Sequence, residues 1–140
     1  MTGVQTCALP ICICGESFRR DVIELNRLVL QGNVKNEASF LISASLKMLP
    51  PNKIVVSYAD TAQGHIGYVY PATNFLFTGT TKPRTDMASK DGKHSRHHLG
   101  DTTNRINRSA KHRYVYFIGD KRWKRTALAA LKYPVQEYPK

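Results

Sequence analysis

The chain has 140 residues, the length of one domain of ordinary size. Its 41% hydrophobic and 22% charged residues are typical of a globular protein and exclude a collagen-like, coiled-coil or wholly disordered chain. No apolar run approaches the roughly 20 residues that span a bilayer, so no membrane segment is predicted. The 21 lysines and arginines outnumber the 10 acidic residues and give a net charge of +11, which favours a polyanionic partner.

The amino end differs from the rest of the chain. Residues 1–12 resemble the translation of a common sequencing-library adapter, and they lack the basic start and the long apolar run of a signal peptide. We therefore expect residues 1–12 to be adapter-derived, and residues 13–140 to be one domain, the C-terminal part of a longer protein. The cysteines, Cys7, Cys12 and Cys14, all lie near this end, which excludes a disulfide-built fold and is compatible with a reducing cytoplasm.

The first predicted elements are a segment that is either a strand or a helix, and after it a second segment that is a helix. Residues 21–30 have apolar positions that fit either a buried strand or a helix. Residues 37–49 predict an amphipathic helix that begins at an Asn36 N-cap and ends before Pro50. Its apolar side is predicted to carry Leu41, Ala44, Met48 and Leu49.

The middle of the chain predicts two strands that flank a short helix. Residues 53–58 are β-branched and apolar, which indicates a buried strand. Asp60 and Gln63 resemble a capping box that opens a helix through residues 65–73. Residues 74–81 then alternate like a strand.

A long polar stretch, residues 82–110, is too long for an ordinary connection and is predicted to be functional or disordered. An alternating strand over residues 112–118 and a basic helix over residues 121–132 follow. This order predicts an α/β fold with a mixed sheet that is covered on at least one face. Residues 82–125 contain 13 Lys and Arg and 4 Asp and Glu, so most of the positive charge lies there.

The basic stretch suits the phosphates of a nucleic acid, where lysine and arginine give salt-dependent affinity without reading sequence. The aromatic residues that interleave with it either stack on bases or face the core: Tyr114, Tyr116, Phe117 and Trp123. His94, His97 and His98 raise the alternative of a metal site, including one of the HNH nuclease kind. No cysteine follows them to complete a zinc site, so we predict a histidine-rich loop beside phosphates and no metal.

The densest polar cluster, residues 57–68, lies where a predicted strand gives way to a helix. Open α/β sheets bind ligands at such strand ends. Gly64 and Gly67 would let a ligand approach the backbone closely. Two alternatives stay open, because Asp60 also suits a helix cap and His65 also suits a structural histidine.

Four segments together resemble a known family: residues 57–60 (SYAD), 64–70 (GHIGYVY), 72–75 (ATNF) and 111–117 (KHRYVYF). They are similar to the bacteriophage Mom family of DNA adenine modification proteins, which are related by fold to the GNAT N-acetyltransferases. Residues 24–30 resemble the central strand that precedes the acyl-donor helix of that fold, and the resemblance extends over residues 14–140. It implies a partial GNAT-like acyltransferase fold, with a mixed central sheet, flanking helices and the first strands missing.

The resemblance implies transfer of a methylcarbamoyl (carbamoylmethyl) group to the exocyclic amine of adenine, which protects phage DNA against host restriction. The expected partners are double-stranded DNA and a small-molecule group donor that the sequence does not identify, in the cytoplasm of the host cell. Adenine is expected to be flipped from the duplex and stacked on Tyr68 or Tyr70. Asp60 or His65 is the candidate general base. Backbone amides of the helix after Asn36 are expected to bind the donor.

The resemblance and the charge pattern together name the site residues. The candidate catalytic residues are Ser57, Asp60, His65, Tyr68 and Tyr70. The candidate substrate-binding residues are Asn26, Arg27 and Asn74. The candidate DNA-binding residues are Arg96, Lys111, His112, Arg113, Lys121 and Arg122. Two positions depart from the family pattern: Pro71 replaces an expected glutamine, which should remove a helix hydrogen bond, and Phe77 replaces a common tyrosine.

Two other functions remain open. An ordinary GNAT N-acetyltransferase that uses acetyl-CoA should carry a glycine-rich Q/R-x-x-G-x-G/A pattern after its central strand, and residues 31–36 (QGNVKN) do not supply it. A non-catalytic DNA-binding module would need the basic stretch but not the polar residues between 57 and 74.

Removal of residues 1–12 is expected to leave folding intact, because an adapter-derived segment packs on nothing. The measurement is the thermal unfolding midpoint of the shortened chain. A clear fall in that midpoint would mean that Leu9 or Ile11 packs in the core, and it would contradict the adapter interpretation.

Overall fold

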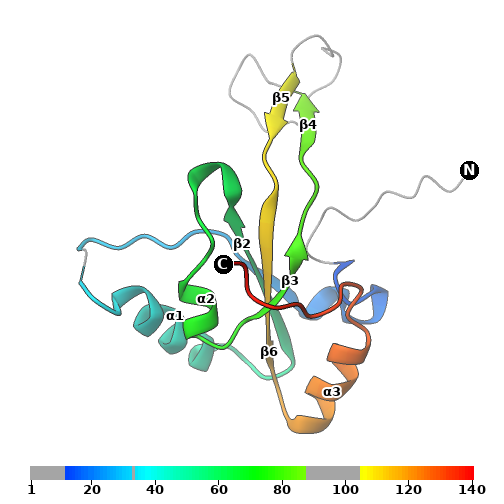
Figure 1. The fold of residues 1–140 in the computed structure, drawn as a ribbon. Coiled ribbons are helices and arrows are strands. Elements are labelled where there is room, and N and C mark those ends of the chain that lie inside the picture. The colour runs from blue at the N-terminus through cyan, green and yellow to red at the C-terminus, as the bar shows by residue number, and fades with distance from the viewer. Residues whose placement is uncertain (1–11, 33, 88–104) are drawn as a thin grey trace, which may run out of the picture.

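The structure, a computed structural model, describes residues 12–32, 34–87 and 105–140 (Figure 1). In chain order its elements are η2 (Glu16–Asp21), β1 (Val22–Leu25), α1 (Glu37–Met48), β2 (Lys53–Asp60), η3 (Thr61–Gln63), α2 (Val69–Ala72), β3 (Leu76–Thr80), β4 (Arg84–Met87), β5 (Arg105–Arg108), β6 (Lys111–Ile118) and α3 (Lys121–Ala129). In these described ranges, no helix is long and apolar enough to cross a membrane. Residues 1–11, nearly all of the segment expected to be adapter-derived, lie outside the described residues.

A four-stranded mixed sheet with strand order β1-β2-β6-β3 forms the centre. β1 runs parallel to β2, whereas β6 is antiparallel to both β2 and β3. The β2–β6 pairing is the longest and runs from Lys53 opposite Ile118 to Asp60 opposite Lys111. The predicted α/β class and mixed sheet are therefore confirmed. Residues 21–30, for which the sequence fitted either a strand or a helix, begin as the strand β1.

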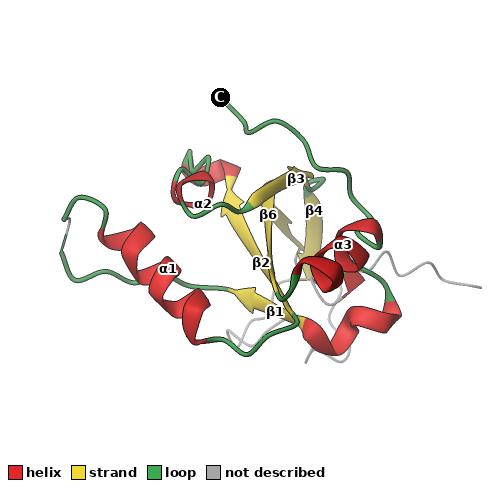
Figure 2. Cartoon of the chain, turned by 90° about the horizontal axis from the view of Figure 1, so that it is seen from below, coloured by secondary structure: helices red, strands yellow, loops and turns green. Residues whose placement is uncertain are grey.

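Alternate residues of β2 and β6 enter two apolar layers, one on each face of the sheet. The layer beside α3 contains Ile13, Cys14, Val22, Ile54, Val56, Val115, Phe117 and Ala127. The layer beside α1 and α2 contains Ile42, Leu46, Val55, Ala59, Phe75, Phe77 and Tyr114. Figure 2 shows α1 and α2 on one side of the strands and α3 on the other. The sheet is thus covered on both faces.

Helix α1 forms over the predicted residues but buries a different side. Its buried side chains are Ile42 and Leu46, whereas Met48 is 85% and Leu41 is 40% exposed. The predicted face is wrong because apolar residues occur all around this helix, so their spacing does not select the side that meets the sheet. Asn36 occupies the N-cap position with a left-handed backbone (φ 66°) and makes no side-chain capping bond.

The helix predicted after Asp60, through residues 65–73, is replaced by η3 at residues 61–63 and the shorter helix α2. Asp60 caps η3 by accepting a hydrogen bond from the Ala62 N–H at 3.0 Å, and α2 begins only at Val69. Pro71 lies in the first turn of α2, where backbone N–H groups have no partner within the helix. The expected loss of a helix hydrogen bond therefore does not occur.

The polar stretch of residues 82–110 contains a second, antiparallel sheet made of β4 and β5, which we call the β4–β5 ribbon. It projects beyond the four-stranded sheet, along the direction of β3 and β6 (Figure 1). Sequence reasoning missed these strands because high polarity without apolar periodicity predicts a loop. Residues 88–104, which contain Arg96, His94, His97 and His98, lie outside the described residues.

The predicted DNA contact Arg113 belongs to the core, as do Tyr114 and Phe117, for which the sequence left stacking on bases open. Tyr114 is fully buried, Phe117 is 8% exposed and Arg113 is 7% exposed. The Arg113 guanidinium donates to Thr78 Oγ1 (2.9 Å) and to the Thr78 carbonyl (2.8 Å), and it lies 3.4 Å from the centre of the Tyr133 ring. The structure therefore gives Arg113 a packing role in place of the predicted DNA contact, because its position on β6 directs it into the layer beside α3.

Arg113→Ala is expected to destabilise the fold by roughly 2–4 kcal/mol, since it removes the contact with the Tyr133 ring and the two hydrogen bonds that the guanidinium donates to Thr78. The measurement is urea unfolding followed by circular dichroism. The matched control is Lys111→Ala at an exposed position of the same strand, which should change stability by no more than about 0.5 kcal/mol. Equal stability of the two variants would contradict the packing role.

Candidate functional site

A groove lies between α1 and the face of β1 that α1 covers, and it extends along the chain that follows β1. β1 and β2 are paired as far as Leu25 and Ser57; beyond that pair, β2 continues to Asp60 while the chain after β1 turns away. The groove has a volume of about 330 Å³ and lies between β1, residues 27–29 and α1. Its lining is Ile23, Glu24, Leu25, Arg27, Leu28, Val29, Leu41, Ile42, Ser45, Leu46, Leu49 and Val55.

Two hydroxyl groups meet beside this groove. Ser57, which is fully buried, has its Oγ 2.9 Å from the Leu25 carbonyl oxygen and 2.7 Å from the Tyr70 hydroxyl oxygen. A carbonyl only accepts, and a serine hydroxyl has one hydrogen to donate. Ser57 therefore donates to Leu25 and accepts from Tyr70, so the Tyr70 oxygen keeps the capacity to accept a hydrogen bond from a ligand.

The ring of Tyr70 is held by other aromatic residues. It stacks on Tyr114 with ring centres 4.7 Å apart, and its edge meets Phe75 at 5.3 Å. The Tyr114 hydroxyl donates to the Ile66 carbonyl, and burial raises the pKa of Tyr114 to about 12. This neutral phenol therefore fastens the loop after η3 over the sheet.

Gly67 is required by this packing. Its backbone has φ +79°, and a Cβ atom there would lie 2.7 Å from the Tyr70 ring and 2.8 Å from the Tyr114 ring. The sequence predicted that Gly64 and Gly67 admit a ligand to the backbone. At Gly67 it is the two tyrosine rings that approach, whereas a Cβ at Gly64 would meet nothing within 4 Å.

Asp60 lies in a second polar group at the end of β2. Its carboxylate accepts hydrogen bonds from the Ser109 hydroxyl and the Ala62 N–H, and these bonds lower the pKa of Asp60 below its ordinary value of 3.8. Lys111 and His65 lie close enough to lower it further. Thr61 adds two bonds to the Ala110 carbonyl, through its N–H at 3.2 Å and its hydroxyl at 2.7 Å. Asp60 is thus an ionised cap that joins η3 to residues 109–111.

The predicted polar cluster is therefore two groups. Ser57 and Tyr70 lie in the layer beside α1 and α2, whereas Asp60 is bonded to Ser109 at the rim of the sheet. The odd spacing between Ser57 and Asp60 directs their side chains to opposite faces of β2. His65 is exposed on the loop between η3 and α2, on the side of the second group.

The remaining candidate residues are exposed to different degrees. Tyr68 is 79% exposed at the start of α2, and Asn74 is exposed in a left-handed turn (φ 63°). Asn26 and Arg27 are exposed after β1, and Arg27 also lines the groove. Arg27 therefore lies at the groove, whereas Tyr68 is not among the residues that line the groove and extends toward solvent.

The candidate DNA-binding residues do not form one surface. Lys111 is exposed at the ribbon end of β6, whereas Lys121 and Arg122 are exposed on α3 at the other end of that strand (Figure 1). His112 is half-buried, with Nδ1 2.8 Å from Thr80 Oγ1 and its ring against Phe77. The basic stretch is therefore divided between the two ends of β6.

Metal ligands are not gathered in the part of the chain that the structure describes, where no group of three or more His, Cys, Asp or Glu residues is placed to hold an ion. The candidate histidines of residues 94–98 lie outside it. Sequence reasoning missed Ser109, because its partner Asp60 is 49 positions away and no local pattern marks such a contact.

Comparison with known proteins identifies the family. The Mom protein family matches residues 11–140. The chain belongs to the Mom family. It is also 31% identical over 144 residues to the methylcarbamoylase Mom of Escherichia phage Mu; the alignment covers 89% of this chain, which spans 59% of the length of that protein.

The Mom family assignment confirms the resemblance found in the four sequence segments. The match begins at residue 11, just inside the segment expected to be adapter-derived. It includes both polar groups, the groove and the β4–β5 ribbon, so each of these features belongs to the Mom-like part of the chain.

Gly67→Ala is expected to destabilise the fold by about 2–5 kcal/mol, because the left-handed backbone and the two nearby rings both oppose a Cβ atom. The control is Gly64→Ala, which has a similar backbone (φ +67°) but open space around it, and which should cost only about 1–2 kcal/mol. Urea unfolding measures both variants. Equal losses would mean that the rings of Tyr70 and Tyr114 do not pack on Gly67.

Proposed function

We propose that this chain acts in DNA modification, by transferring a methylcarbamoyl (carbamoylmethyl) group to the exocyclic amine of adenine in double-stranded DNA. The similarity to a methylcarbamoylase supports this type of reaction. The observation that carries the proposal is the hydroxyl pair of Ser57 and Tyr70, which is bonded to the carbonyl of Leu25, a residue that lines the groove. Acting in the host cytoplasm, such a reaction would protect phage DNA against restriction.

The groove suits a small group donor. Its volume of about 330 Å³ is at the lower end of the roughly 300–1,000 Å³ of small-molecule sites. The lining is mostly apolar, with Glu24, Arg27 and Ser45 as its polar residues. A donor bound there would direct its transferred group toward Leu25 and the hydroxyl pair, where the Tyr70 oxygen accepts a hydrogen bond from an N–H group.

Transfer requires an acceptor for one proton. The amine of adenine is a weak nucleophile because its lone pair is delocalised into the ring, so its N–H bond must break as the new N–C bond forms and the donor loses its leaving group. His65 is our candidate for that acceptor, since it is exposed beside the Asp60 carboxylate and histidine is the commonest general base. The lowered pKa of Asp60 makes that carboxylate a weaker base.

Tyr68 is the candidate stacking partner of a flipped adenine. A base must leave the duplex before an enzyme can act on its amine, and aromatic rings then hold it. The side chain of Tyr68 is 79% exposed, whereas the ring of Tyr70 is already stacked on Tyr114. We therefore assign stacking to Tyr68 and hydrogen bonding to Tyr70.

A GNAT-like fold is part of this proposal, but acetyl-CoA is less suitable as the donor. The order β1, groove and α1 follows the order of central strand, donor site and helix that the resemblance implies. Glu37 lies in the first turn of α1, and among the described residues its Oε2 atom is buried without a hydrogen-bond partner. The negative charge of Glu37 at the N-terminus of α1 repels a phosphate group. This repulsion weighs against a phosphate-bearing donor at that end of the helix.

His65→Ala is expected to lower the yield of modified adenine about 10²–10⁴-fold, as loss of a general base does. Asp60→Asn keeps a good helix cap and is expected to lower it less than about tenfold. The measurement is mass spectrometry of nucleosides from the DNA of bacteria that express each variant.

Two results would contradict this function. Modified adenine at the unsubstituted level in His65→Ala would remove His65 from the reaction. Unmodified adenine with the unsubstituted chain, together with retained DNA binding, would favour a non-catalytic DNA-binding module.

A further inference from the structure

The β4–β5 ribbon is exposed along most of its described length. All four residues of β5 are exposed, as are Arg84 and Thr85 of β4. The base of the ribbon is fixed, because the Thr81 N–H donates to the Lys111 carbonyl at 2.8 Å and the Lys111 N–H donates to Thr81 Oγ1 at 3.0 Å. The described strands are thus anchored at their base and present their side chains to solvent along the rest of their described length.

The charge of the ribbon suits a polyanion. Residues 82–87 and 105–111 contain one acidic residue, Asp86, and these cations: Lys82, Arg84, Arg105, Arg108 and Lys111. Arg84 and Arg108 are directly opposite each other in the register. Like charges in that position repel, so a third group is needed to hold them together.

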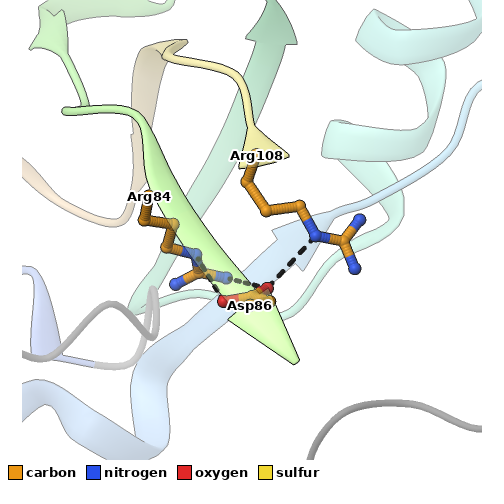
Figure 3. A network of polar contacts seen from close by, with 3 residues as sticks. All are labelled: Arg84, Asp86 and Arg108. Carbon is orange, nitrogen blue, oxygen red and sulfur yellow. Dashed lines mark hydrogen bonds and ion pairs between the residues drawn. The ribbon is translucent and has the colours of Figure 1, made fainter. Parts of the chain in front are cut away.

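Asp86 supplies that group (Figure 3). Its carboxylate lies 3.4 Å from Arg84 Nε and 3.1 Å from Arg108 Nε. The Asp86 side chain is only 19% exposed, whereas those of Arg84 and Arg108 are 56% and 48% exposed. The other nitrogens of Arg108 point away from Asp86 in Figure 3. Asp86 thus orients Arg84 and Arg108, while their guanidinium groups remain on the surface, where they can donate hydrogen bonds to phosphate oxygens.

We propose that the β4–β5 ribbon enters the major groove of duplex DNA, with Arg84 and Arg108 on the phosphates. Paired strands with their side chains are about 10 Å thick, which fits a major groove about 12 Å wide and not a minor groove of about 6 Å. Thr85 and Asn107 are opposite each other on the second face, which lies toward the other wall of the groove. This inference rests on the proposed function only in taking duplex DNA as the partner.

This docking also brings the candidate catalytic loop to the correct side of the duplex. The exocyclic amine of adenine is displayed in the major groove. Ser109, which follows β5 directly, is bonded to Asp60 at the start of the loop that carries His65. A ribbon in the major groove therefore approaches DNA from the groove in which the amine lies until the adenine is flipped out of the duplex.

The test is dimethyl sulfate footprinting of the 140-residue chain on duplex DNA, because this reagent methylates guanine N7 in the major groove and adenine N3 in the minor groove. We expect protection of guanine N7. The double variant Arg84→Ala, Arg108→Ala should lose that protection and reduce the slope of log affinity against log salt by about 2. Circular dichroism checks that the variant is folded.

The matched control is Arg20→Ala, which removes an exposed charge on η2, away from the ribbon (Figure 1), and should keep both the slope and the protection. Protection of adenine N3, protection of neither atom, preference for single-stranded DNA or no binding to duplex DNA would each overturn the proposal. An effect of Arg20→Ala as large as that of the ribbon variant, per charge removed, would also overturn it.

The variant Asp86→Asn distinguishes two roles of Asp86: its orientation of Arg84 and Arg108, and its contribution to the net charge of the ribbon. It makes the chain more basic, so a role limited to charge would increase protection of guanine N7; an orienting role decreases protection, and we expect the decrease. An increase would overturn the positioning role of Asp86. Modified adenine with guanine N7 unprotected would refute the ribbon docking alone, whereas protected N7 without modified adenine would refute the proposed reaction alone.

Discussion

The pairing of β2 with β6 is the interaction on which the rest of the structure depends. These strands are the two inner strands of the sheet, so β1 and β3 are each attached to one of them. Their alternating side chains supply both apolar layers, and the same pairing brings Asp60 opposite Lys111 at the rim. Because the sheet joins residues about fifty positions apart, the candidate site exists only after this long-range pairing has formed.

The division of the polar cluster follows from sheet geometry. A strand directs neighbouring side chains to opposite faces, so a motif that is continuous in sequence is split in space. The group in the layer beside α1 and α2, Ser57 with Tyr70, is held by stacked rings. The group at the rim, Asp60 with Ser109 and His65, meets solvent and charge. The two groups are therefore distinct in their surroundings as well as in their place on β2.

Most of the fold could be predicted from the sequence, since residues 53–58 are β-branched and apolar, residues 112–118 alternate, and the helix over residues 37–49 is delimited by Asn36 and Pro50. Three features were not accessible. The buried face of α1 depends on the sheet that it meets, and the β4–β5 ribbon has no apolar alternation. The position of Arg113 in the core depends on Thr78 and Tyr133, which are remote in sequence. For the site, the residue types were indicated, but their separation into two groups required the register of β2.

Ser109 gives the ribbon a mechanical connection to the loop that carries His65. Its hydroxyl is bonded to Asp60, and Thr61 is bonded twice to the adjacent Ala110 carbonyl. Hydrogen bonds tolerate only small changes of length and angle. Three hydrogen bonds thus join the base of the ribbon to the backbone that precedes His65, so a bend of the ribbon would either break them or change the position of that backbone.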